Sequence, residues 1–517
     1  MFTRIFAAST FGITAFVVEI ETHLENGLPN FTVVGLPDSA VKEARERIPA
    51  ALKNSGYAFP QKRITINLAP ADVKKEGSGF DLPMALGILA SAGVINADSE
   101  RWRTTLALGE LALDGEIRAI RGSLPIALCA AEHSEIRTFL LPAANAFEAA
   151  MVEQLQVVPV HTLQEAVDWF NGALDIPPAS VDRRAIFEDR KDQYDVDFAD
   201  VKGQEHVKRA MEVAAAGGHN LIMIGPPGSG KTMLAKRLPT ILPPLSFEEA
   251  IETTKIHSVA GLLPQGEALV VTRPFRAPHH TISNAALVGG GMTVIRPGEI
   301  SLAHHGVLFL DELPEFPRNV LEVLRQPLEE KKITISRSRM TVEYPANFML
   351  VCSMNPCPCG NLGNPRQVCH CTPRQIQRYV SKISGPLLDR IDIHVEVPVV
   401  PYEQLATKSE GERSVVVRER VVKAREIQQR RFSAVPAVYK NADMQSADVR
   451  RFCQIDSEGE AMMRMAMRQL GLSARAFDRI LKVARTIADL DGAEKIAAHH
   501  LAEAIQYRSL DRQYWNA

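Results

Sequence analysis

One short segment, LIMIGPPGSGKT at residues 221–232, constrains the fold of this chain more than any other. It places four apolar residues before the pattern G-x-x-x-x-G-K-T, which predicts a buried strand, a tight loop and a helix from Lys231. The backbone N–H groups of such a loop and of the helix N-terminus surround phosphate oxygens. We therefore expect Lys231 to reach the β- and γ-phosphates of ATP and Thr232 to ligate Mg²⁺. The loop itself would consist of Gly225, Pro226, Pro227, Gly228, Ser229 and Gly230.

Two further apolar runs end in polar residues that belong to the same expected site. GVLFLDEL at 306–313 predicts a central strand with Asp311 at its carboxyl end, where ligands bind in parallel sheets. Asp311 would hold Mg²⁺, and Glu312 would orient or deprotonate the attacking water. FMLVCSMNP at 348–356 predicts another strand, which brings Asn355 near the γ-phosphate. The alternative is an Asn that caps a turn.

Two arginines lie beside predicted element boundaries. Arg390 stands between a helix-like segment and the strand IDIHVEV, where it serves either the nucleotide site or a surface ion pair with Asp389 or Asp392. Arg475 begins a helix predicted within 471–490. It either folds over the nucleotide or is a solvated helix residue.

The chain divides into regions of different texture. Residues 1–175 mix short β-like runs with Ala-rich helical stretches, and 176–198, rich in Pro and charge, is typical of a linker. Residues 199–400 alternate helical and strand-like runs, as parallel α/β sheets do, and 401–517 are helical. These textures predict an α/β core followed by a helical region.

Composition excludes several classes of protein. Lys+Arg 59 against Asp+Glu 61 gives a net charge of -2, so any nucleic-acid surface must be a local patch. The sequence has no run of 18 apolar residues, which argues against a membrane-spanning helix. Residues 1–20 faintly imitate a signal peptide, but FVVEIETHL alternates like a strand. We interpret this start as the first β-hairpin of a cytoplasmic protein.

The order of the motifs resembles one family. GPPGSGKT, GVLFLDEL, CSMNPCPCG, SGPLLDRID and LSARAFDRILKVARTIADL follow one another as in the magnesium-chelatase-like AAA+ ATPases, specifically the ComM/YifB group. The resemblance spans essentially the whole chain. It implies a P-loop AAA+ core with a C-terminal helical lid, assembled as a ring, by analogy a hexamer. It also implies Asn355 as sensor 1, Arg390 as the finger supplied to the neighbouring subunit, and Arg475 as sensor 2.

Residues 1–175 resemble a second fold. RITINLAPADVKKEGSGFDLPMALGIL and LALGELALDGEIRAI are similar to the peptidase domain of Lon and the related domain of RadA, an S5-like α+β fold. Lon-type proteolysis uses a Ser nucleophile and a Lys base. Aligned on KKEG, the nucleophile position is Gly79, with Ser78 one place early, and RAIRGSLPIAL has no Lys. We interpret the region as a non-proteolytic structural or partner-binding domain.

Two basic segments suggest a grip on DNA. The segment 268–298 and the hairpin-like KKITISRSRMTV at 331–342 contain no acidic residue. Helicases of the minichromosome-maintenance type have insertions at matching places that line the ring pore, which implies that both segments track a nucleic-acid backbone. The alternative is two solvated loops. The expected DNA contacts are Arg273, Arg276, Lys331, Lys332, Arg337 and Arg339.

Four of the seven cysteines crowd into CPCGNLGNPRQVCHC. Four thiolates on a Gly/Pro-rich loop can close a tetrahedral Zn²⁺ site, and His370 can substitute for one ligand. Redox-active thiols and unliganded cysteines are the alternatives. The candidate ligands are Cys357, Cys359, Cys369 and Cys371.

Together these features favour an ATP- and Mg²⁺-dependent motor that moves on single-stranded or branched DNA, a helicase or branch-migration enzyme in recombination or natural transformation. The alternative is a magnesium-chelatase-type motor that remodels a protein partner for metal insertion. The first region and the absence of a D-x-S-x-S motif argue against that alternative. A protein-remodelling or peptidase-linked AAA+ machine is the third hypothesis.

Overall fold

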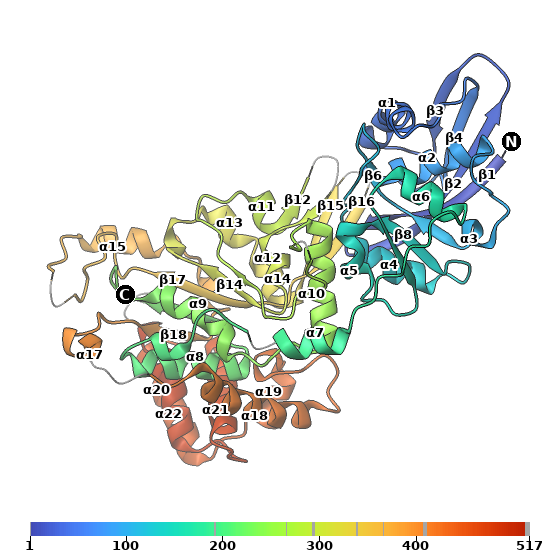
Figure 1. Cartoon of the computed structure of the whole chain (residues 1–517). Coiled ribbons are helices and arrows are strands. Elements are labelled where there is room, and N and C mark those ends of the chain that lie inside the picture. Colours follow the sequence, from blue (N-terminus) through green and yellow to red (C-terminus); the bar gives the residue numbers. More distant parts are fainter. Residues whose placement is uncertain are drawn as a thin grey trace.

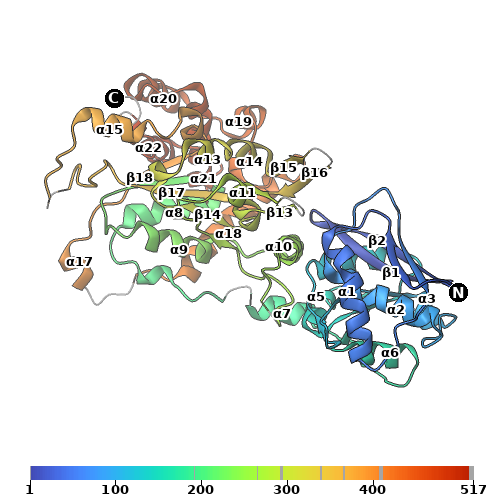
Figure 2. The ribbon, with the colours of Figure 1, turned by 90° about the horizontal axis from the view of Figure 1, so that it is seen from above.

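The computed structural model describes residues 2–190, 193–264, 266–291, 295–337, 340–364, 367–406 and 411–511. They form an elongated molecule with an N-terminal α/β unit at one end and a larger unit of sheet and helices at the other (Figure 1, Figure 2). Within those ranges, no helix combines the length and the apolar composition needed to cross a lipid bilayer.

The N-terminal unit is built on a mixed seven-stranded sheet with the order β3-β4-β2-β1-β5-β8-β9. Strands β1 and β2 pair antiparallel along their length, which confirms the hairpin predicted from the sequence. The elements are β1 (Phe2–Phe11), β2 (Thr14–Glu25), β3 (Asn30–Val34), α1 (Ser39–Asn54), β4 (Arg63–Ala69), α2 (Asp81–Ser91), α3 (Glu100–Arg103), β5 (Thr105–Ala107), β6 (Glu110–Leu111), β7 (Ile117–Arg118), α4 (Ser123–Glu132), β8 (Thr138–Pro142), α5 (Ala146–Ala149), β9 (Gln156–Val160) and α6 (Leu163–Phe170).

The segment predicted as a linker contains a helix, α7 (Arg183–Arg190). Its Phe187 ring meets the edge of Phe247 from α10 (Phe247–Ala260), with the ring centroids 5.9 Å apart. Ala250 of α10 and the preceding Leu245 are buried in the same apolar core as the N-terminal sheet. The two units therefore share one apolar core, although the charge and prolines of the segment between them predict a linker.

The second unit is built on a five-stranded sheet with the order β11-β14-β17-β10-β18. All its neighbouring strands are parallel. The central strands β10, β14 and β17 are buried along their whole length, as expected for strands covered on both faces. Because the strands are parallel, their carboxyl ends lie at one edge of the sheet and their amino ends at the other.

The elements of this unit follow the chain from residue 205. They are α8 (Glu205–Gly217), β10 (Leu221–Ile224), α9 (Lys231–Ile241), α10, β11 (Phe275–Arg276), α11 (Asn284–Val288), β12 (Gly289–Gly290), β13 (Arg296–Pro297), α12 (Glu299–Leu302), β14 (Val307–Leu310), α13 (Arg318–Glu322), α14 (Arg325–Glu330), β15 (Lys332–Arg337), β16 (Met340–Pro345), β17 (Met349–Met354), α15 (Pro373–Val380), α16 (Gly385–Leu388), β18 (Ile393–Glu396) and α17 (Tyr402–Ala406).

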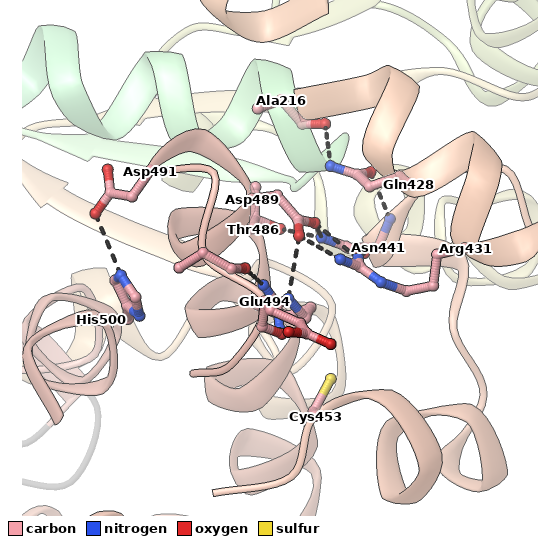
Figure 3. Close-up of polar contacts among 12 residues, drawn as sticks. Ala216, Gln428, Arg431, Asn441, Cys453, Thr486, Asp489, Asp491, Glu494 and His500 are labelled. Carbon is pink, nitrogen blue, oxygen red and sulfur yellow. Dashed lines mark hydrogen bonds and ion pairs between the residues drawn. The ribbon is translucent and has the colours of Figure 1, made fainter. Parts of the chain in front are cut away.

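The C-terminal helices pack against α8 on one side of this sheet (Figure 1). Gln428 and Asn441 belong to a buried polar network that joins these helices to one another and to α8 (Figure 3). The Gln428 amide donates to the Ala216 carbonyl at 3.1 Å, and the Asn441 amide donates to Thr486 at 3.0 Å and to Asp489 at 2.8 Å. The helices are α18 (Ser414–Phe432), α19 (Ser446–Phe452), α20 (Ser457–Leu470), α21 (Ala474–Leu490) and α22 (Ala498–Gln506).

Asp489 is the acidic centre of this network. Its fully buried carboxylate pairs with Arg431, and with Arg485 at 3.1 Å. We expect Asp489→Ala to destabilise the protein by about 3–5 kcal/mol, because it leaves two cations without a buried counter-charge. Thermal unfolding of the full chain measures the effect, with Asp491→Ala as the control, since the Asp491 side chain is 42% exposed. Equal unfolding temperatures for the two variants would contradict this account.

Candidate nucleotide-binding site

The loop between β10 and α9 has the geometry that its glycines predict. Gly228 and Gly230 have φ values of 74° and 89°, in the left-handed region that favours glycine. A Cβ added to Gly225 would lie 2.1 Å from the backbone oxygen of Val397, so only glycine fits there. No atom of the described residues lies within 4 Å of the corresponding Cβ position at Gly228, which leaves that part of the loop open toward a ligand.

Lys231 begins α9 and turns its ammonium group toward the loop. Its Nζ donates to the carbonyls of Gly225 at 2.7 Å and Pro226 at 2.9 Å, and to Oδ1 of Asn355 at 3.2 Å. Burial lowers the pKa of Lys231, while the charges of Asp311 and Glu312 oppose that shift. Neutral carbonyl and amide oxygens thus hold the ammonium group beside the loop. Phosphate oxygens are charged, accept stronger hydrogen bonds and can replace them.

Thr232 and Asp311 offer oxygen atoms side by side. The Thr232 hydroxyl donates to Oδ2 of Asp311 at 2.7 Å, and the Ser353 hydroxyl donates to the other carboxylate oxygen. A hydroxyl and a carboxylate are hard oxygen ligands of the kind that Mg²⁺ prefers. Ser353 is absent from the sequence prediction. Its strand β17 is buried on both faces, so alternation could not single it out.

Glu312 adopts φ of 53°, in the left-handed region, directly after Asp311. Its carboxylate is 53% exposed and lies 3.6 Å from Nδ1 of His280. The sequence predicted His280 only as part of a basic insertion. The structure instead brings it to the residue expected to act on water.

The carboxyl ends of β10, β14 and β17 therefore bring together five of the residues expected at the site. They are Lys231, Thr232, Asp311, Glu312 and Asn355.

Arg390 and Arg475 lie at the opposite, amino edge of the sheet. Asn220 directly precedes β10, and Asp392 directly precedes β18. At this edge the N–H of Asp392 donates to the carbonyl of Asn220, and the side-chain amide of Asn220 donates to the carbonyl of Arg390. Arg475 lies at the start of α21, with its guanidinium 3.9 Å from Asp389. The C-terminal helices therefore place the start of α21 at the amino ends of the strands, away from the phosphate loop of the same chain.

Arg390 has a local partner that the sequence did not indicate. Its side chain is 8% exposed and pairs with Glu329, and it also donates to the carbonyl of Pro386. The Nε atom of this buried guanidinium has no hydrogen-bond partner in the part of the chain that the structure describes. One N–H donor of the Arg390 guanidinium is thus available to a further acceptor.

The structure does not leave Arg273 available to a DNA backbone. Its side chain is 12% exposed, pairs with Glu249 at 3.1 Å and donates to the carbonyl of His305 at 2.6 Å. Arg276 forms a bidentate pair with Glu299, at 2.6 and 2.7 Å. The acidic partners come from α10 and α12, outside the acid-free segment.

Strands β15 and β16 form the hairpin predicted at 331–342. Lys331 pairs with Asp443 at 2.7 Å, and Lys332 pairs with Glu343 at 2.9 Å. The pair of Lys332 and Glu343 is exposed on both sides, so solvent weakens their attraction and a phosphate can replace the carboxylate. Two expected contacts, the Arg337 side chain and Arg339, lie outside the described residues.

The four clustered cysteines converge. Their sulfur atoms all lie within 4.8 Å of one another. Cys357, two residues after Asn355, is buried, and its Sγ lies 3.4 Å from that of Cys359 and 3.7 Å from that of Cys369. Backbone hydrogen bonding from Asn361 lowers the pKa of Cys359 to about 6. Four thiols that lie this close together suit Zn²⁺.

Ser78, one place before the nucleophile position of Lon-type peptidases, contacts a carboxylate and not a lysine. The Ser78 hydroxyl donates to Glu110, and Nζ of the buried Lys75 donates to the carbonyl of Pro70. Among the described residues no lysine hydrogen-bonds to Ser78.

Three family descriptions match consecutive parts of the chain. "Subunit ChlI of Mg-chelatase" matches residues 20–145, "Magnesium chelatase, subunit ChlI" matches 197–405, and "Magnesium chelatase, subunit ChlI C-terminal" matches 411–508. With the parallel sheet and its glycine-rich loop, these matches define a magnesium-chelatase-type AAA+ protein.

Relatives match almost the full chain. It is 46% identical over 512 residues to the competence protein ComM of Haemophilus influenzae, covering 98% of this chain and 97% of that one. It is 44% identical over 506 residues to the YifB protein of Escherichia coli, covering 97% and 96%. The 38 kDa magnesium-chelatase subunit of Rhodobacter capsulatus is 23% identical over 59% of this chain and 84% of that one. The chain therefore belongs to the ComM/YifB family of magnesium-chelatase-like AAA+ proteins.

Proposed function

We propose that this protein uses ATP hydrolysis to move on single-stranded or branched DNA, as a helicase or branch-migration motor in recombination or natural transformation. The observation that carries the ATPase is the meeting of Lys231 with Asn355 and of Thr232 with Asp311 at one sheet edge. The DNA substrate is supported by the identity to a competence protein and by the basic hairpin β15–β16.

Each residue at this edge has a distinct task in hydrolysis. Lys231 exchanges its loop carbonyls for phosphate oxygens, and Asn355 holds the γ-phosphate and the water in line. Thr232 and Asp311 hold Mg²⁺, which when bound neutralises the phosphate charge. Glu312 orients the attacking water and accepts its proton. Phosphoryl transfer needs mainly this positioning and charge neutralisation from the protein.

The amino-edge position of Arg390 and Arg475 supports a shared site. Strands β10 and β18 run side by side for four residues, about 13 Å at 3.3 Å per residue, which separates these arginines from their own phosphate loop. In a head-to-tail ring the amino edge of one subunit faces the loop of the next. We assign Arg390 as the finger and Arg475 as sensor 2 for the neighbouring subunit, in a hexameric ring.

The regions of the chain then take separate tasks. Residues 1–175 form a non-proteolytic, Lon-like domain, which the pairing of Ser78 with Glu110 supports. Residues 176–198 connect it to the ATPase core at 199–400. Residues 401–517 are the helical lid, whose polar network with α8 fixes the position of Arg475.

The residues that we propose as DNA contacts differ from those predicted from the sequence. Arg296 of the short β13 and Arg121 both line a cavity of about 460 Å³ between the two units. Burial and the neighbouring Arg296 lower the pKa of Arg121, and no ion pair joins either arginine to an acidic residue within the described ranges. We propose Arg296, Arg121 and Lys332 as the contacts with the DNA backbone.

DNA-dependent hydrolysis tests this function. We expect single-stranded and forked DNA to raise the ATPase rate of the full chain, and the double variant Arg296→Ala, Lys332→Ala to lose that stimulation at physiological salt. The control is Lys423→Ala on the solvated face of α18, which should respond to DNA as the wild type does. ATPase activity indifferent to DNA would refute the DNA motor and favour the remodelling of a protein partner.

We further propose that the four cysteines hold a structural Zn²⁺. The closed four-thiol set leaves no open coordination position, so the metal stabilises a loop and takes no part in hydrolysis. None of the described cysteines forms a disulfide, which supports a reducing compartment, the cytoplasm.

A further inference from the structure

The cysteine loop lies against the phosphate-binding loop. A Cβ added to Gly360 would stand 2.5 Å from Cδ and 2.7 Å from Cγ of Pro227, and 3.9 Å from Cγ of Asn355. A proline ring is rigid, so it cannot move aside to relieve such a contact. The backbone of the cysteine loop at Gly360 is therefore packed directly on the ring of Pro227.

The turn that makes this contact is organised around one sulfur atom. The N–H of Gly360 donates to the carbonyl of Cys357 at 2.9 Å, and the N–H of Leu362 donates to its Sγ at 3.4 Å. Gly360 has φ of 79°, in the left-handed region. The turn is thus tied to Cys357 on both sides of its Gly360, through the backbone carbonyl before it and the sulfur after it.

Little besides the sulfur cluster orders this segment. β17 ends at Met354 and α15 begins at Pro373, and the described residues between them, 355–364 and 367–372, form neither helix nor strand. Cys359 is exposed, and Cys369 and Cys371 are only half-buried. A loop with so small a core loses conformational entropy when it is fixed, and a metal bound by four thiolates offsets that loss.

We propose that metal bound by the four thiols braces the phosphate-binding loop through the contact of Gly360 with Pro227, so that occupancy of the metal site controls nucleotide affinity. This inference rests on the proposed ATP site and the proposed zinc site. It adds a regulatory link between them, because Asn355 and Cys357 stand two residues apart on the same turn. A chain without its metal would retain Lys231, Thr232 and Asp311 but hold Pro227 and Asn355 less firmly.

Two glycines of this loop provide a matched pair of variants. Gly360 and Gly363 have nearly the same φ, 79° and 77°, so a side chain strains both positions alike. Among the atoms of the described residues, Gly360 has a neighbour within 4 Å of its Cβ position and Gly363 has none. Any difference between Gly360→Ala and Gly363→Ala therefore reports the contact with Pro227 and not the backbone strain.

The experiment measures metal content and the equilibrium binding of a fluorescent ATP analogue on the same samples of the full chain. We expect about one zinc ion per chain in the wild type. Chelation should weaken nucleotide binding by about tenfold or more, and added Zn²⁺ should restore it. Gly360→Ala should weaken nucleotide binding with its zinc retained, whereas Gly363→Ala should bind as the wild type does. Circular dichroism verifies that each sample is folded.

The failures are distinguishable. A folded wild type that binds zinc but no nucleotide refutes the ATP site and the brace with it. A wild type that binds nucleotide but never zinc or another divalent metal refutes the metal site. If zinc can be removed without a change in nucleotide affinity, only the proposed brace is refuted. Equal nucleotide affinities of Gly360→Ala and Gly363→Ala would refute it as well.

Discussion

Lys231→Ala is expected to abolish ATP hydrolysis, with a loss of at least about 10²–10³-fold, the effect of removing one preorganised charge-stabilising donor. Its Nζ is 2.7 Å from the Gly225 carbonyl and 3.2 Å from Asn355, so it is the cation that meets the phosphates on entry. Phosphate release by the full chain measures the loss. Lys236→Ala is the matched control, because Lys236 lies on the exposed side of the same helix, α9.

Glu312→Gln separates binding from hydrolysis at the same site. The amide keeps the size of the side chain but cannot accept a proton from water, so this variant should bind ATP and persist in the assembled state. Hydrolysis by Glu312→Gln at the wild-type rate would show that another residue activates the water. Hydrolysis by Lys231→Ala at the rate of Lys236→Ala would refute the phosphate site as a whole.

Arg390→Ala is expected to hydrolyse ATP slowly although its own Lys231 and Asp311 are intact. A finger arginine accelerates phosphoryl transfer by about 10³–10⁵-fold in other systems. Mixing Arg390→Ala with Lys231→Ala subunits should restore part of the activity, because the Lys231→Ala subunit supplies a finger to an intact phosphate site. The measurement is the ATPase rate over a range of mixing ratios, after exchange of subunits is verified.

Glu329→Gln distinguishes the finger from a local ion pair. Arg390 pairs with Glu329 in its own chain, so a purely structural Arg390 would lose its role equally when either partner changes. We expect Glu329→Gln to retain hydrolysis while Arg390→Ala loses it. Equal losses in both variants, with no recovery in any mixture, would assign Arg390 to local structure.

The phosphate loop and its strands could be predicted because their signals are local. A parallel strand buried on both faces is a continuous apolar run, and the polar residue that ends it lies at the carboxyl edge. Asp311 and Asn355 were found in this way. Ser353 was missed for the same reason, since a strand buried on both faces has no alternation that marks one side chain.

Pairing between distant elements could not be predicted. The segment around Arg273 has no acid of its own, yet Glu249 reaches it from α10 and Asp443 reaches Lys331 from beyond α18. The helix start at Arg475 was predicted correctly, but the sheet edge that it approaches depends on how the C-terminal helices cross the sheet. These are properties of tertiary packing, which the spacing of residues along one segment does not encode.

Helix α10 limits how this protein can be divided into separate parts. Its Ala250, with the neighbouring Leu245, is buried in the N-terminal core, while its Glu249 binds Arg273 of the nucleotide-binding unit. Cutting the chain at the linker would leave an apolar face of this helix in water and a cavity in the unit removed. The N-terminal domain is thus not a detachable accessory. We expect the N-terminal unit to follow any displacement of α10, because this helix packs against α4 of that unit.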